Sequence, residues 1–254
     1  MKLTGVWLTL LDIPPESTEE FNLWYDVDHM PEHVSRPDIL SGRRYVAPAG
    51  LRRLDGVHSC DLTGGHPPYA SLYYFGGPTD FLSAEAAAAQ RATDRRIVKA
   101  GRYWRSGRPA FHGLWHLAAV RTRASVHVAD DAVPYLPHRS LLVMLGRASA
   151  AERVDEAVAW WDSTQSDDLH DITGVLASMR FTPGPPGDPD LILHLVLCRA
   201  PAAEVMRDLS QVRHLHRLTG RYPAYSGSYE TVAVLPYQSI IPFQYDFEMD
   251  GGLD

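Results

Sequence analysis

Residues 21–33 read FNLWYDVDHMPEH, and residues 42–45 read GRRY. The first run has the spacing of an amphipathic helix, which we expect over residues 17–29. Pro31 predicts that this helix breaks just before it, because proline lacks an amide hydrogen and restricts the preceding residue. The second run lies in a predicted strand, residues 41–48. The stretch therefore reads as a helix, a break, a loop and a strand.

Parts of this stretch recur in the second half of the chain. Trp24-Tyr25-Asp26 matches Trp160-Trp161-Asp162, and Arg44-Tyr45 matches Arg180-Phe181, both at an offset of 136 residues (24 to 160 and 44 to 180). Five matches in the same order predict two copies of one unit. The three later matches are Pro78 with Pro201, Gly101-Arg102-Tyr103 with Gly220-Arg221-Tyr222, and Gly113-Leu114-Trp115 with Gly227-Ser228-Tyr229.

Each copy is predicted to run strand, helix, strand, strand, helix, strand. Aromatic and aliphatic runs indicate the strands, and acidic residues after Ser or Thr indicate the helix starts. In the first copy the strands are 3–12, 41–48, 69–76 and 112–122, and the helices are 17–29 and 79–98. In the second copy the strands are 139–147, 174–183, 190–199 and 228–236, and the helices are 150–168 and 201–218.

This order is that of a ferredoxin-like unit, whose sheet has helices on one face and is bare on the other. We therefore expect an α+β fold in which two tandem ferredoxin-like units close an intrachain barrel by burying their bare faces. The units are residues 1–122 and the degenerate residues 139–236. Residues 123–138 form the linker, and residues 237–254 form a C-terminal extension that either packs on a neighbouring surface or acts as a lid or arm.

Composition narrows the class of protein. The chain has 254 residues, of which 45% are hydrophobic, and a formal net charge of -7. Without a basic cluster, a nucleic-acid partner is not expected. No apolar run approaches the ~20 residues of a membrane helix, and no signal peptide precedes the first strand, so we expect a cytoplasmic location. Cys60 and Cys198 suggest no disulfide framework. A monomer and a homodimer are both compatible with the sequence.

The residues quoted above resemble the dimeric α+β barrel superfamily, and within it the EthD-like proteins. The motif that carries the resemblance is Phe21-Asn22-x-Trp24-Tyr25-Asp26-x-x-His29-x-Pro31, followed by Pro37 and Arg44-Tyr45. The superfamily includes cofactor-independent monooxygenases acting on polyketide quinones, polyketide cyclases, lactone isomerases and haem enzymes. The second half departs from the motif, since Gln165 stands where His29 would match and Leu169 where His33 would.

His29 is the predicted acid–base catalyst. At a helix C-terminus, and near Asp26 and Asp28, its protonated form is favoured, which would hold its pKa near neutrality. Asp26 would orient the imidazole, while Tyr25 or Arg44 would steady an oxyanion. The alternative is a histidine–carboxylate pair that only closes the helix end. The further predicted substrate-binding residues are His33, Arg44, Trp7, Tyr73 and Trp115.

The function that we expect is therefore a cofactor-independent cyclisation, isomerisation or oxygenation of an enolised, small hydrophobic metabolite, aromatic or polyketide-like. Two alternatives stay open. One is a non-catalytic protein that binds such a metabolite. The other is a haem protein with an axial histidine in the second unit, where His194, His214 and His216 are the candidates. Residues 29–33 also spell H-x-x-E-H, a zinc pattern, but Pro31 lies inside it, so no metal site is expected.

Overall fold

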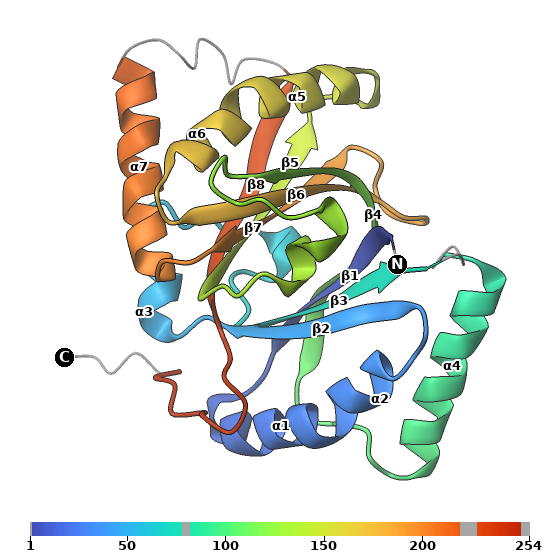
Figure 1. The fold of residues 1–254 in the computed structure, drawn as a ribbon. Helices are drawn as coiled ribbons and strands as arrows, with labels where there is room; N and C mark the ends of the chain where they lie inside the picture. The colour runs from blue at the N-terminus through green and yellow to red at the C-terminus, as the bar shows by residue number, and fades with distance from the viewer. Residues whose placement is uncertain (1, 78–81, 219–227, 250–254) are drawn as a thin grey trace.

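The computed structural model describes residues 2–77, 82–218 and 228–249. Eight antiparallel strands form a closed barrel in the order β1-β3-β2-β8-β5-β7-β6-β4, with the longer helices outside it (Figure 1). The strands are β1 (Leu3–Asp12), β2 (Ile39–Val46), β3 (Tyr69–Gly76), β4 (Arg108–Thr122), β5 (Ser140–Ala148), β6 (Val175–Pro183), β7 (Leu191–Cys198) and β8 (Tyr229–Ser239).

The helices cover the outer faces of the sheet. The α-helices are α1 (Thr18–Trp24), α2 (Met30–Val34), α3 (Ala49–Arg52), α4 (Ala84–Lys99), α5 (Val154–Trp160), α6 (Ser166–Asp171) and α7 (Ala202–Leu218). Two π-helical turns, η2 (Tyr25–His29) and η6 (Trp161–Gln165), and four short 3-10 helices, η1 (Pro15–Ser17), η3 (Asp61–Thr63), η4 (Asp130–Tyr135) and η5 (Ala151–Arg153), complete the described elements.

The two halves have the same topology. The first forms the sheet β4-β1-β3-β2, and the second forms β8-β5-β7-β6, each in the order expected of a ferredoxin-like unit. Strand β2 of the first half pairs with β8 of the second half, and β6 of the second half pairs with β4 of the first. The β4–β6 seam runs from Trp115↔Pro183 to Thr122↔Ala177, whereas the β2–β8 seam has only Tyr45↔Ser239 and Val46↔Gln238. The predicted α+β fold of two ferredoxin-like units in an intrachain barrel is confirmed.

Strand alternation separates three apolar layers. Because successive side chains point to opposite faces, Leu8 of β1 points into the barrel while Trp7 points toward the helices. Side chains from both halves fill the barrel, among them Leu8, Leu72, Val143, Leu195 and Tyr237. The other two layers lie between each half of the sheet and its own helices. The barrel interior is thus a packed core.

The predicted helix break at Pro31 is wrong. Met30, before the proline, is helical with φ −61° and ψ −48°, and α2 continues to Val34. The π turn η2 accommodates the proline, because its wider loop relieves the contact with the preceding turn and needs no hydrogen bond from the missing amide. The second half has the same turn, η6, with Asp167 in place of the proline. The turn therefore belongs to both halves.

The other predicted elements have their counterparts, with ends displaced by a few residues. The main differences are that β4 begins at Arg108 and that α4 is described from Ala84. Of the predicted repeat, Pro78, Gly220-Arg221-Tyr222 and Gly227 lie outside the described residues. No helix in the described ranges is long and apolar enough to span a membrane.

The linker and the C-terminal segment both pack on the barrel. Val133 of η4 is fully buried in the core of the barrel. Strand β8 extends to Ser239, beyond its predicted end, and residues 240–249 then cross back to the first half. There the amide of Ile240 donates to the carbonyl of Arg44 (3.1 Å), and the amide of Ala49 donates to the carbonyl of Glu248 (2.9 Å).

Candidate functional site

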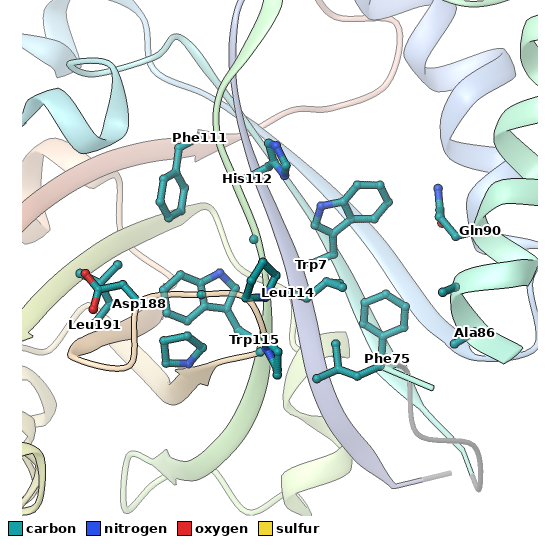
Figure 2. A pocket seen from close by; sticks show the side chains of 18 of the residues that line it. Trp7, Phe75, Ala86, Gln90, Phe111, His112, Leu114, Trp115, Asp188 and Leu191 are labelled. Atoms are coloured by element: carbon teal, nitrogen blue, oxygen red, sulfur yellow. The ribbon is translucent and has the colours of Figure 1, made fainter. Parts of the chain in front are cut away.

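A cavity of about 760 Å³ lies on both sides of β4 (Figure 2). This volume falls within the ~300–1,000 Å³ of small-molecule sites. Trp7, Phe75, Ala86 and Gln90 lie on one side of the paired strands β1 and β4, and Phe111, Trp115, Asp188 and Leu191 lie on the other. The cavity therefore connects the layer under α4 with the end of the barrel.

The pairing of β4 explains why the cavity continues from one side of this strand to the other. Strand β6 pairs with β4 only from Trp115 onward, so the part of β4 before that residue is paired with β1 alone. The β6–β7 turn, residues 184–190, lies across the gap, where the amide of Gly184 donates to the carbonyl of Leu114 (2.8 Å). Both halves of the chain thus contribute to one cavity.

Arg36 is the buried cation of the cavity wall. It is 8% exposed, and its guanidinium pairs with Asp38 through Nε (3.0 Å) and Nη2 (2.5 Å). Its Nη1 donates to Oε1 of Gln90, which also lines the cavity. Nη2 also approaches the carbonyl of Ala86 (3.5 Å), and Nη1 carries a second N–H that neither Asp38 nor Gln90 accepts.

Three further charged or titratable side chains line the cavity, namely Arg91, His112 and Asp188, and Arg91 of α4 is exposed. His112 of β4 lines it and is exposed, which leaves its imidazole open to both ligand and solvent. On the barrel side, Asp188 forms an ion pair with Arg147 (2.6 Å). The remainder of the lining is mostly aromatic, aliphatic and proline side chains. Such a surface suits a planar, largely apolar molecule with few oxygen atoms.

The motif histidines lie behind Trp7. The ring of His33 is 6.1 Å from that of Trp7 and 5.3 Å from that of Tyr73, measured between centroids. His29 lies next along the helix, with its ring 4.4 Å from that of His33. Both nitrogens of His33 and Nδ1 of His29 are buried without a hydrogen-bond partner among the described residues. His33 therefore packs against Trp7, and His29 packs against His33.

The expected near-neutral pKa of His29 is wrong. Burial, with the positive fields of His33 and Arg44, lowers the pKa of His29 to about 3. Burial, aided by Arg36, lowers the pKa of His33 to about 4. Both imidazoles are consequently neutral at physiological pH. The prediction failed because the helix does not end at His29, and because the nearby carboxylates bind arginines instead.

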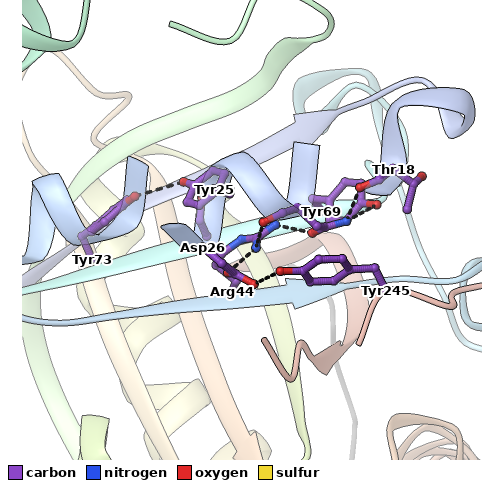
Figure 3. Close-up of polar contacts among 9 residues, drawn as sticks. Thr18, Tyr25, Asp26, Arg44, Tyr69, Tyr73 and Tyr245 are labelled. Carbon is purple, nitrogen blue, oxygen red and sulfur yellow. Dashed lines mark hydrogen bonds and ion pairs between the residues drawn. The ribbon is translucent and has the colours of Figure 1, made fainter. Parts of the chain in front are cut away.

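Asp26 takes part in a buried network away from the cavity (Figure 3). Its Oδ1 pairs with Nη1 of Arg44 (2.5 Å), and its Oδ2 accepts from the hydroxyl of Tyr245. Arg44 also lies over the ring of Tyr25, with Cζ 4.3 Å from the centroid. The hydroxyl of Tyr25 donates to Ser71 Oγ (2.8 Å) and accepts from Tyr73 (3.1 Å). Asp26 thus holds the helix to β2 and does not contact His29.

The predicted site residues fall into three groups. Trp7 and Trp115 line the cavity. His33 and Tyr73 contact Trp7 from behind. The remaining predicted residues, Tyr25, Asp26, His29 and Arg44, are not among the lining residues. Sequence reasoning did not identify Arg36, Gln90, Phe111, His112 or Asp188 as site residues. Only Arg36, in the loop directly after the motif, carried a local signal.

The described haem-ligand candidates, His194 and His214, do not line the cavity. Within the described ranges, no group of three or more His, Cys, Asp or Glu side chains could hold a metal ion. His194 is fully buried with its ring stacked on Trp161, and neither of its ring nitrogens has a hydrogen-bond partner among the described residues. His214 is exposed on α7, and the side chain of His216 lies outside the described residues.

No protein-family model matches the sequence, and a search of curated proteins found no relative. Among solved structures, an anthrone oxidase-like protein is similar, with 14% identity, a TM-score of 0.50, and coverage of 100% of this chain and 98% of that chain. A mutant chlorite dismutase from Candidatus Nitrospira defluvii has 9% identity and a TM-score of 0.54, and the match covers 95% of this chain and 93% of that one. At such identities the likeness shows the fold alone, that of the dimeric α+β barrels.

Proposed function

We propose that this protein is an enzyme that binds a planar aromatic ketone or phenol in the cavity and removes a proton from it. The observation that carries the proposal is the lining itself, in which aromatic walls surround His112 and the buried guanidinium of Arg36. The anion formed in this way is electron-rich, and its oxidation by dioxygen would be a reaction of oxidase or monooxygenase type. The fold shared with an anthrone oxidase-like protein supports the choice of substrate class.

His112 is the proposed base and Arg36 the proposed oxyanion ligand. A base must reach the proton that it abstracts, and His112 lines the cavity whereas His29 and His33 do not. Arg36 is held by Asp38 and Gln90, so its free N–H is preorganised for an oxygen that becomes negative. His33 and His29 are positioning residues in this scheme, since they hold Trp7 against the substrate.

Anthrone is the substrate to test first, since it is a tricyclic ketone with an acidic methylene group. Oxygen uptake and formation of anthraquinone would be followed for the native protein and for His112→Gln. A general base contributes about 10²- to 10⁴-fold, so we expect kcat to fall by at least about 100-fold. His127→Gln, an exposed histidine of the linker, is the control and should match the native protein.

Two outcomes would change the assignment. An acid limb of the pH–rate profile near the pKa of His33, about 4, together with an active His112→Gln variant, would make His33 the base. Binding of anthrone without any oxygen uptake would favour the second candidate, a non-catalytic protein that carries such a metabolite, which the same aromatic cavity supports.

A further inference from the structure

Arg91 lies at the rim of the cavity, where solvent reaches it. Helix α4 turns one face toward the cavity, and on that face Ala87 and Arg91 lie one helical turn apart. Ala87 is half-buried whereas Arg91 is exposed, so this row of side chains leads from the cavity wall to its mouth. The guanidinium of Arg91 is therefore accessible to a ligand that extends to the rim.

The other formal charges of the lining are compensated within the protein. Arg36 pairs with Asp38 (2.5 Å), and Asp188 pairs with Arg147 (2.6 Å). The side chain of Arg91 forms neither an ion pair nor a hydrogen bond within the described ranges. Among the described residues the lining thus carries an uncompensated positive charge, although the whole chain has a formal net charge of -7.

A carboxylate suits this position better than a neutral polar group. The planar guanidinium presents parallel N–H donors that match the two oxygen atoms of a carboxylate. At the exposed rim the carboxylate keeps part of its hydration, so its desolvation costs little. The aromatic body of the same molecule can meanwhile be buried against the apolar lining.

Asp188 determines which end of the ligand bears the acid. It lies on the barrel side of β4, whereas Gln90 of α4, next to Arg91 in the chain, lies on the other side (Figure 2). A carboxylate beside Asp188 would meet a like charge, which is unfavourable. Beside Arg91 it meets an opposite charge. The acidic end of the ligand is therefore expected on the α4 side of the cavity.

We infer that the ligand carries a carboxylate on its aromatic ring system, and that Arg91 binds this group at the rim. This inference rests on the proposed function and deepens it, since it adds an acidic substituent to the substrate class. Arg91 is then a specificity-determining residue, and it takes no part in the removal of the proton.

The test compares two compounds of nearly the same shape, anthraquinone-2-carboxylate and the neutral anthraquinone-2-carboxamide. Dissociation constants would be measured by titration calorimetry with the native protein, Arg91→Gln and Arg91→Glu. An exposed ion pair predicts that Arg91→Gln binds the carboxylate about 2- to 5-fold more weakly and the carboxamide as tightly as the native protein does. Arg91→Glu should enlarge the loss to about 4- to 25-fold, because repulsion replaces attraction.

Arg95→Gln is the matched control. Arg95 is an exposed arginine one turn further along α4 and lies outside the lining, so this variant should bind both compounds like the native protein. An Arg91→Gln variant that keeps the native affinity for the carboxylate, or loses affinity for both compounds alike, would overturn the inference and leave the proposed function standing. An equal loss in Arg95→Gln would also overturn it. If neither compound binds the native protein, the inference and the proposed function fail together.

Discussion

At equivalent points of the two halves, the same backbone carries different chemistry. Arg44 is paired in register with Ser71, and Arg180 is paired with His194, so Ser71 and His194 occupy corresponding positions. In the first half the hydroxyl of Tyr25 bonds Ser71, whereas in the second half the ring of Trp161 stacks on His194. The first half thus keeps a polar network where the second has packed rings.

The same correspondence between strands includes a residue that lines the cavity. Thr9 lies opposite both Ser71 and His112, and Met144 lies opposite both His194 and Val234. His112 of the first half therefore corresponds to Val234, which is fully buried in the second-half layer. The comparison teaches that the two halves share a scaffold, and that the place of the cavity-lining His112 is taken in the second half by a buried valine.

Each half has an ion pair between an aspartate of its helix and an arginine of the following strand, and substitutions in these two pairs are expected to have the largest effect. Asp26–Arg44 has side-chain exposures of 9% and 6%, whereas Asp162–Arg180 has 50% and 13%. Arg44→Met should lower the free energy of unfolding by about 3–5 kcal/mol, because it leaves a buried carboxylate unpaired. Arg180→Met should lower it by about 1 kcal/mol or less. Urea denaturation of both variants measures the difference, and equal losses would show that burial does not separate the pairs.

The buried histidines predict a loss of stability in acid. The pKa of His33 is about 4 in the folded protein, against about 6.5 for an unfolded histidine. Between these values the unfolded chain binds more protons, so stability is complete above about pH 6.5 and falls as the pH drops toward 4. Each such histidine adds up to about 1.4 kcal/mol per pH unit to the slope of the unfolding free energy against pH.

Replacing His33 by the second-half residue, His33→Leu, isolates one of these contributions. The variant should show a shallower dependence of unfolding free energy on pH, by up to about 1.4 kcal/mol per unit between pH 4 and 6.5. Urea denaturation at a series of pH values measures this slope. A slope identical to that of the native protein would mean that His33 is already protonated in the fold.

The smallest expected effect concerns the C-terminal segment. The hydroxyl of Tyr245 donates to Asp26, and no counterpart of this segment covers Asp162 among the described residues. Tyr245→Phe should lower the free energy of unfolding by about 1 kcal/mol, since the phenol of Tyr245 is only partly buried. Thermal unfolding, with Tyr103→Phe at an exposed tyrosine for comparison, would detect the change. A Tyr245→Phe variant as stable as the native protein would make the contact incidental.

The elements that sequence predicted well are those with local signals. The aromatic run Tyr69–Gly76 is a strand because its side chains are apolar on both faces, and that pattern is visible without any tertiary information. The helix break predicted at Pro31 was wrong because the π turn that accommodates the proline has no sequence signature. Asp26 was predicted to orient His29 because the two lie close together in sequence, whereas its partner in the structure, Arg44, lies on β2.

The cavity was harder to predict because it depends on how separate elements meet. Its walls come from α4, from β4 and from the β6–β7 turn of the other half. Trp7 and Trp115 were predicted as binding residues from their strands alone. His112 gains its importance only from its placement beside them, which no periodicity or motif in the chain encodes, whereas Arg36 directly follows the motif.

The unequal seams of the barrel bear on how the chain is made. Strand β2 is complete early in synthesis, but its outer edge is paired only by β8, from the far end of the described chain, through Tyr45↔Ser239 and Val46↔Gln238. Until β8 arrives, the nascent first half presents a free strand edge, which is a template for pairing with another chain. A first half that folded during synthesis would therefore expose this edge to other chains until the second half is complete.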